Sequence, residues 1–112
     1  MFSFSEKKDY MVIKIIEPKI FQEKVFIFKE QLLSIIENHS NKIILDMSGV
    51  EVINSTGIGV LILINDKIKK QSGIMIICCL NNLLNELFER MRLNTIFSIT
   101  DSLDNAERFV KQ

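Results

Sequence analysis

Residues Lys42–Ile64, KIILDMSGVEVINSTGIGVLILI, place a strand, a polar turn and a helix directly after one another. The apolar run Ile43–Leu45 predicts a buried strand, and the apolar-rich segment from about Ser55 to Gln71 predicts a helix. Asn54–Ser55–Thr56 lies where that helix begins, and such side chains usually accept hydrogen bonds from the free N–H groups of a first helical turn. A helix N-terminus also favours negative charge. A phosphate on Ser55 would therefore be tolerated without unfolding the domain.

Length and composition indicate one soluble globular domain spanning residues 1–112. The chain has 112 residues, of which 47% are hydrophobic and 25% charged. Lys and Arg together number 14, as do Asp and Glu, so the formal net charge is zero. This balance gives no electrostatic reason to expect nucleic acid or an anionic membrane surface as a partner.

The distribution of apolar residues predicts a cytosolic protein without membrane insertion. Polar residues at Ser5–Asp9 interrupt the start of the chain before a signal peptide could form. The uninterrupted apolar run Val60–Ile64 in the central helix is far too short to cross a bilayer.

The cysteines and carboxylates predict neither a metal site nor a cofactor. Cys78 and Cys79 are adjacent, so on a strand they would point to opposite faces as buried, reduced thiols. Asp46, Glu51 and Asp66 are dispersed along the chain and are interpreted as solvated carboxylates of turns and helices.

The remaining pattern predicts an α/β fold. Phe2–Ser5 and Tyr10–Ile16 form an expected hairpin, followed by an amphipathic helix over 21–38. Strands and helices then alternate: strand 42–47, helix 55–71, strand 74–80, a helix from 82 to about 91, strand 96–100 and helix 103–111. Such alternation favours a mixed, largely parallel sheet of four or five strands with about four helices and right-handed crossovers.

Helical spacing also predicts which side chains of the last two helices face the core. In the helix after residue 81 the expected apolar stripe is Leu83, Leu84, Leu87, Phe88 and Met91. In the C-terminal helix the expected inward residues are Ala106, Phe109 and Val110.

Sites in parallel α/β folds lie beyond the carboxyl ends of the strands, and Ser55 fits that position. From the residues alone three interpretations compete: a helix cap, a catalytic nucleophile, and part of a nucleotide-binding loop. Catalysis lacks support because His39, interpreted as an exposed loop residue, is the one imidazole and residues 53–57 do not form a Gly-x-Ser-x-Gly elbow. Gly57-x-Gly59 alone is a weak nucleotide signal, because no Walker lysine accompanies it. We therefore expect a protein that is not an enzyme.

Leu45–Val50 (LDMSGV) followed by Ile53–Val60 (INSTGIGV) resembles the signature of STAS domains, and more narrowly that of bacterial anti-sigma factor antagonists. The resemblance covers nearly the whole chain. It continues through Gly73 and the apolar strand after it, the helix with Leu87–Phe88 and the closing segment Ile96–Ser102.

The resemblance implies a partner-switching mechanism. The unphosphorylated antagonist binds an anti-sigma factor that is also a serine kinase and thereby frees a sigma factor. Phosphorylation of the first hydroxyl residue of the motif, here Ser55, ends this binding, and a serine phosphatase restores it. The switch-site neighbours are Asn54, Thr56, Gly57, Ile58 and Gly59. Ile58 and its neighbours are expected to form an apolar docking surface beside the phosphate.

Two positions depart from the family pattern. Asn54 stands where the family often has Asp, and Glu17–Ile20 (EPKI) stands where a Gly-Glu-Leu-Asp-like turn is common. In the expected fold that turn lies near the switch, so partner choice is expected to differ. The alternative is a STAS module that binds without phosphorylation, as a signalling scaffold or as a small subunit of a membrane transport complex.

Overall fold

Strands and helices alternate through most of the chain, as the apolar pattern predicts. The computed structural model describes residues 1–38 and 41–111, so the expected loop at His39 lies outside the described residues. The elements in chain order are β1 (Phe2–Glu6), β2 (Met11–Ile15), β3 (Lys19–Ile20), α1 (Glu23–Asn38), β4 (Lys42–Asp46), β5 (Val52–Ile53), α2 (Ser55–Lys70), β6 (Ile74–Cys78), α3 (Asn82–Arg90), the 3-10 helix η1 (Leu93–Thr95), β7 (Ser98–Thr100) and α4 (Leu103–Val110).

The central sheet has five strands in the order β1-β2-β4-β6-β7. β1 and β2 form the expected antiparallel hairpin, and every other neighbouring pair is parallel. In the middle of the sheet, Ile44 of β4 lies beside Val12 of β2 and Ile76 of β6. Within residues 1–38 and 41–111, the mixed, largely parallel sheet and the four α-helices confirm the predicted fold class.

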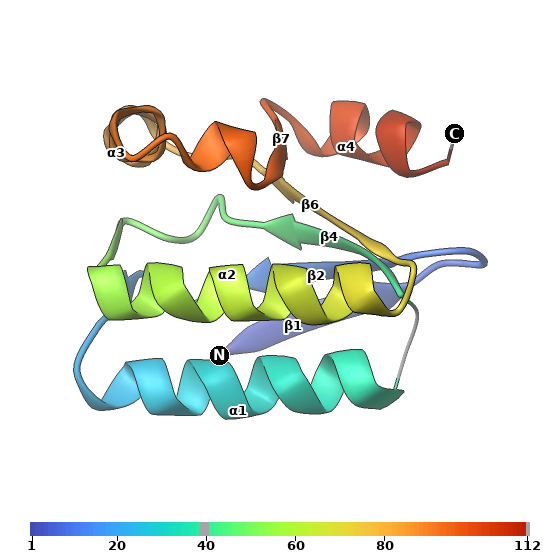
Figure 1. The fold of residues 1–112 in the computed structure, drawn as a ribbon, viewed down its shortest axis with the longest axis horizontal. Coiled ribbons are helices and arrows are strands. Elements are labelled where there is room, and N and C mark those ends of the chain that lie inside the picture. The colour runs from blue at the N-terminus through green and yellow to red at the C-terminus, as the bar shows by residue number, and fades with distance from the viewer. Residues whose placement is uncertain (39–40, 112) are drawn as a thin grey trace.

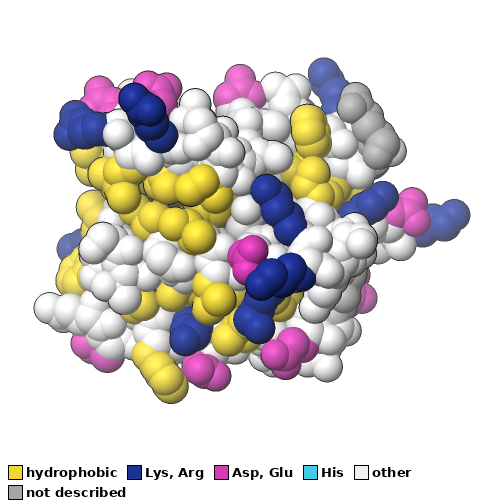
Figure 2. All heavy atoms as spheres, in the orientation of Figure 1, with side chains coloured by type: hydrophobic (Ala, Val, Ile, Leu, Met, Phe, Trp, Pro, Cys, Tyr) yellow, Lys and Arg dark blue, Asp and Glu magenta, His cyan; other side chains and the backbone are white. Residues whose placement is uncertain are grey.

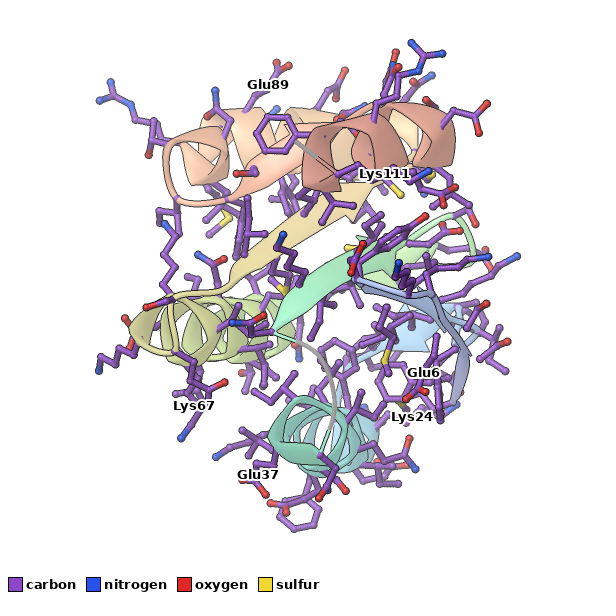
Figure 3. All side chains as sticks on the ribbon, turned by 90° about the vertical axis from the view of Figure 1, so that its right-hand side faces the viewer. Glu6, Lys24, Glu37, Lys67, Glu89 and Lys111 are labelled. Carbon is purple, nitrogen blue, oxygen red and sulfur yellow. The ribbon has the colours of Figure 1, made fainter. Side chains whose placement is uncertain are left out.

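The helices cover the two faces of the sheet unequally. α1 and α2 lie side by side on one face, while α4 lies on the other (Figure 1). The view turned by 90° separates these layers, with the sheet between them (Figure 3). Alternation along β4 explains the arrangement, because Ile43 and Leu45 point into the larger core and Ile44 points toward α4.

The structure also contains a second, two-stranded sheet that the sequence does not predict. β3 pairs in parallel with β5, with Lys19 opposite Val52 and Ile20 opposite Ile53. Each strand has two residues, so neither shows a periodicity that could predict it. This pairing joins the segment before α1 to the segment before α2. It therefore holds the backbone just before Ser55, where the candidate site lies.

The inward faces of α3 and α4 are narrower than predicted. α3 buries Leu84 and Phe88, which are one helical turn apart, whereas Leu83 is 59% exposed and Met91 is also exposed. α4 buries Ala106 and Val110 but leaves Phe109 exposed.

Both predictions were wrong at these three positions because each short helix fully buries side chains along only a single i, i+4 row. Hydrophobic side chains consequently gather on the surface between α2 and α3 (Figure 2).

The strand predicted over 96–100 is shorter in the structure. Ile96 belongs to the end of η1, where its N–H donates to the carbonyl of Leu93 at 3.0 Å, and β7 begins at Ser98. Asn65 of α2 is buried and donates to the Ile96 carbonyl at 3.3 Å, which holds this turn against the helix. No helix among the described residues is both long and apolar enough to cross a membrane.

Candidate functional site

The segment that leads into Ser55 is held by backbone hydrogen bonds to the segment before α1. The carbonyl of Pro18 accepts from the N–H groups of Glu51, at 2.7 Å, and Val52, at 3.1 Å. The N–H of Asn54 donates to the carbonyl of Ile20 at 3.1 Å. The expectation that residues 17–20 lie near the segment that leads into Ser55 is therefore confirmed.

Asn54 caps α2. Its backbone is extended, with φ −87° and ψ 175°, and its Oδ1 atom accepts a hydrogen bond from the N–H of Gly57 at 2.8 Å. This is the geometry of an N-cap residue whose side chain satisfies a free donor of the first turn. The structure uses Asn54 as the cap and leaves Ser55 as the first helical residue.

The Ser55 side chain is exposed and has no capping role. Within residues 1–38 and 41–111 its hydroxyl has no hydrogen-bond partner, and no base lies in position to activate it. Thr56 is exposed as well, and the first turn of α2 contains no acidic residue. The site therefore offers a free hydroxyl at the positive end of a helix, which suits acceptance of a phosphoryl group better than nucleophilic catalysis.

The predicted docking role of Ile58 was wrong, because Ile58 is only 2% exposed. It begins the buried row of α2 that continues through Leu61 and Ile64.

The two glycines on either side of Ile58 differ in the space around them. A Cβ at Gly57 would lie 2.6 Å from Cγ1 of Ile53, so this glycine allows close packing, whereas a Cβ at Gly59 would meet nothing within 4 Å.

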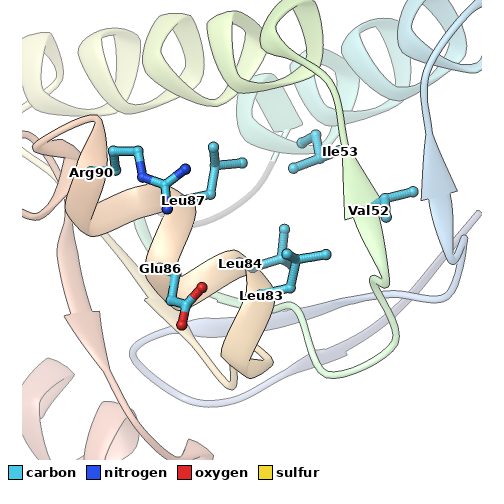
Figure 4. A pocket seen from close by; sticks show the side chains of 7 residues that line it. All are labelled: Val52, Ile53, Leu83, Leu84, Glu86, Leu87 and Arg90. Atoms are coloured by element: carbon cyan, nitrogen blue, oxygen red, sulfur yellow. The ribbon is translucent and has the colours of Figure 1, made fainter.

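Two apolar grooves flank the candidate site in place of the surface expected at Ile58. The first lies between β5 and α3, and Figure 4 shows Leu83, Leu84 and Leu87 of α3 pointing toward Val52 and Ile53. Glu86 and Arg90 also line this groove.

The second groove lies between α1 and α2. Its lining includes Thr56 and Gly59 of α2 together with Phe26 of α1, which is 68% exposed. Both grooves are therefore built partly from residues of the loop and helix that carry Ser55.

A second polar cluster lies at the carboxyl ends of β4 and β6. Asp46 was predicted to be solvated but is only 8% exposed, and its Oδ1 accepts from the N–H of Ser48 at 2.9 Å. Cys78 ends β6, and Cys79 follows it in a left-handed conformation with φ 69°.

The prediction that the two cysteines point to opposite faces was also wrong, because their sulfurs lie 3.1 Å apart. Both cysteines are free thiols, with Cys78 buried and Cys79 half-buried. Burial is the main cause that raises the pKa of both thiols. Sequence spacing could have indicated that Asp46 and Cys78 end neighbouring strands, but nothing in it predicts the left-handed turn at Cys79.

Comparison with known proteins identifies the family to which this fold belongs. A sequence profile of the STAS domain matches residues 2–106. The crystal structure of a Thermotoga maritima protein assigned as an anti-sigma factor antagonist superposes with a TM-score of 0.87 at 25% identity, covering 99% of this chain and 95% of that one.

Two further structures share the fold at lower identity. An anti-sigma factor antagonist of Mycobacterium paratuberculosis has a TM-score of 0.88 at 16% identity, covering 100% of this chain and 94% of that one. The phosphorylated form of the Bacillus cell fate determinant SpoIIAA has a TM-score of 0.71 at 14% identity, covering 97% of this chain and 99% of that one. Since the profile spans nearly the whole sequence and these structures share its architecture, the chain belongs to the STAS domain family.

Proposed function

We propose that this protein is an anti-sigma factor antagonist whose binding to an anti-sigma factor is switched off by phosphorylation of Ser55. The anti-sigma factor acts as the serine kinase, and a serine phosphatase restores the binding form. The protein itself has no enzymatic activity in this scheme. Similar structures described as anti-sigma factor antagonists support the general role.

The observation that carries the proposal is the free hydroxyl of Ser55. Because Asn54 caps α2, modification of Ser55 removes no hydrogen bond that the fold uses. A phosphate there would lie near the free N–H groups and the positive end of the helix dipole. The fold can therefore carry either form of Ser55.

Phosphorylation would act on binding through charge. A phosphoserine adds about −1.5 to −2 charges at neutral pH. Beside grooves lined by apolar residues such as Leu83 and Phe26, a docked partner would have to remove water from that charge. A penalty of only about 2.7 kcal/mol would weaken affinity roughly a hundredfold.

The test begins with intact-mass and fragment mass spectrometry of the protein purified from its own cells. Phosphatase-treated protein is the control. We expect one phosphate on Ser55. Ser55→Ala should abolish the modification by the cognate anti-sigma factor kinase and ATP, while Thr56→Ala, which removes the neighbouring exposed hydroxyl, should retain it.

Binding of the unmodified protein to the anti-sigma factor is then compared with that of Ser55→Glu and Ser55→Ala. We expect Ser55→Glu to lose binding with an unchanged circular dichroism spectrum, and Ser55→Ala to bind like the wild type. If both variants bind like the wild type and no phosphate is found under any growth condition, the switch is refuted. A STAS module that binds its partner constitutively, in a signalling scaffold or a transport complex, would then be the better description.

A further inference from the structure

The cluster of Asp46, Cys78 and Cys79 is not needed for the proposed switch. Its three ligand atoms, one carboxylate oxygen and two sulfurs, all lie within 4.8 Å of one another. Asp46 and Cys78 face each other in the parallel register of β4 and β6, so their side chains leave the sheet on the same side. The left-handed backbone of Cys79 then turns its sulfur back toward that of Cys78.

We propose that Asp46, Cys78 and Cys79 form a binding site for a thiophilic divalent cation such as Zn²⁺. Two thiolates and one carboxylate are ligands that zinc prefers, at about 2.3 Å for sulfur and 2.0–2.2 Å for oxygen. Around a tetrahedral ion such bonds separate the ligand atoms by about 3.5–3.8 Å. Small side-chain rotations from the present arrangement would produce this spacing, and each thiol would release its proton to solvent on coordination.

The surroundings of the cluster favour a cation. The N–H of Ser48 orients one oxygen of Asp46, which leaves the second oxygen available as a ligand. Glu107 of α4 contributes further negative potential at Cys78.

Access to the cluster comes from Cys79, which is half-buried whereas Cys78 is buried. A non-glycine residue at φ 69° is held in a region that glycine adopts more easily. Cys79 therefore places a thiol at a position where the backbone conformation alone would favour glycine. A bound ion would use that thiol and leave the fourth coordination position open to water.

The site is also connected to the loop before Ser55. Cys79 lies two residues before Asn81, whose Nδ2 donates to the carbonyls of Val50 and Glu51, each at 3.3 Å. An ion that fixes Cys79 would thus fix the start of α3 and the loop that leads into β5.

The experiment titrates the reduced, metal-free protein with Zn²⁺ in competition with a chromophoric chelator, and with Cd²⁺ while following the ultraviolet charge-transfer absorption of cadmium thiolates. We expect one ion per chain. Cys79→Gly removes one thiol and suits the left-handed backbone, so it should stay folded while its affinity falls at least about tenfold. Asp46→Asn keeps the acceptor for Ser48 and should also weaken binding about tenfold or more. Asp66→Asn, an exposed carboxylate elsewhere, is the matched control and should bind like the wild type.

Thermal unfolding of the metal-free variants verifies that they are folded. Equal affinity in the wild type and Cys79→Gly would overturn the proposal, because the ion would then be bound elsewhere on the surface. Undiminished affinity in Asp46→Asn would overturn the three-ligand site. Absence of a one-to-one complex in the wild type would also refute it and leave the thiol pair as a hydrogen-bonded packing contact. None of these results bears on phosphorylation of Ser55.

Discussion

The Oδ1 atom of Asn54 lies 2.8 Å from the backbone nitrogen of Gly57, so the residue before Ser55, and not Ser55 itself, caps α2. Either residue could have capped the helix, but the two residues have separate roles in the structure. Asn54 stabilises the start of α2, and Ser55 carries the free hydroxyl. A modification can therefore change the surface without removing the cap.

That separation predicts different stabilities for two single substitutions. Asn54→Ala removes the acceptor for the N–H of Gly57 and should lower the free energy of unfolding by about 1 kcal/mol. Ser55→Ala removes an exposed hydroxyl without a capping role and should change it by less than about 0.5 kcal/mol. Urea unfolding followed by circular dichroism measures both. A larger loss in Ser55→Ala than in Asn54→Ala would show that Ser55 is the cap.

The two glycines of α2 predict opposite effects of alanine. At Gly59 a methyl group meets nothing within 4 Å, so Gly59→Ala should stabilise the helix by about 0.5–1 kcal/mol. At Gly57 the methyl group would lie 2.6 Å from Cγ1 of Ile53, so Gly57→Ala should destabilise by roughly 1–2 kcal/mol despite its better helix propensity.

Urea unfolding of both variants tests this contrast, and binding to the anti-sigma factor adds a second readout. Gly59 lines the groove between α1 and α2, and among the described residues no atom would meet the added methyl group. We therefore expect Gly59→Ala to stabilise the fold but to weaken the binding of a partner that docks in this groove. A variant that is more stable and binds equally well would show that no partner approaches this part of α2.

Much of the fold could be predicted from the sequence because its signals are local. The apolar run Ile43–Leu45 and the helical spacing that begins at Phe21 each specify an element without knowledge of the rest of the chain. The β3–β5 ladder could not be predicted, because two-residue strands carry no period. Phe109 was misassigned because helical spacing identifies a stripe but not how wide a surface the tertiary structure covers.

The candidate site was predictable in position but not in detail. A hydroxyl between a strand and a helix located Ser55, whereas the choice of Asn54 as the cap depends on backbone angles that either residue could adopt. The exposure of Leu83 and the burial of Ile58 both depend on packing between elements distant in sequence. For the same reason the sequence did not predict the groove between β5 and α3.

That groove predicts a further pair of contrasting variants. Leu84 is buried and Leu83 is exposed, although they are adjacent in α3 and both line the groove. Leu84→Ala should lower stability by about 2–5 kcal/mol because it leaves a cavity in the core. Leu83→Ala should change stability by less than about 0.5 kcal/mol.

If the groove contacts the anti-sigma factor, Leu83→Ala should weaken binding by about tenfold or more, as expected when a central apolar side chain of an interface is lost. Isothermal titration calorimetry with the wild type and Leu83→Ala measures this. The exposed Met91, at the end of the same helix but absent from the groove lining, provides the matched control as Met91→Ala. Equal losses in Leu83→Ala and Met91→Ala would indicate that the groove has no specific role.

On the face of the sheet that α4 covers, Tyr10 donates a hydrogen bond to Glu107 of α4. This bond, followed by burial, raises the pKa of Tyr10 from its ordinary value of 10 to about 12. Because the folded-state pKa is raised, the neutral phenol stabilises the fold. That contribution is fully present below pH 10, and it is lost as the pH rises through about 12.

Tyr10→Phe should therefore lower the free energy of unfolding by about 1 kcal/mol at neutral pH, where the hydrogen bond is intact. The difference between the wild type and Tyr10→Phe should shrink when urea unfolding is repeated at increasing pH above 10. Lys111 also interacts with this ring, because its Nζ lies 5.9 Å from the centre of the Tyr10 ring. The comparison is therefore repeated with Lys111→Met in both proteins. A difference that stays constant up to pH 12 in both backgrounds would mean that the Tyr10–Glu107 hydrogen bond does not attach α4 to the sheet.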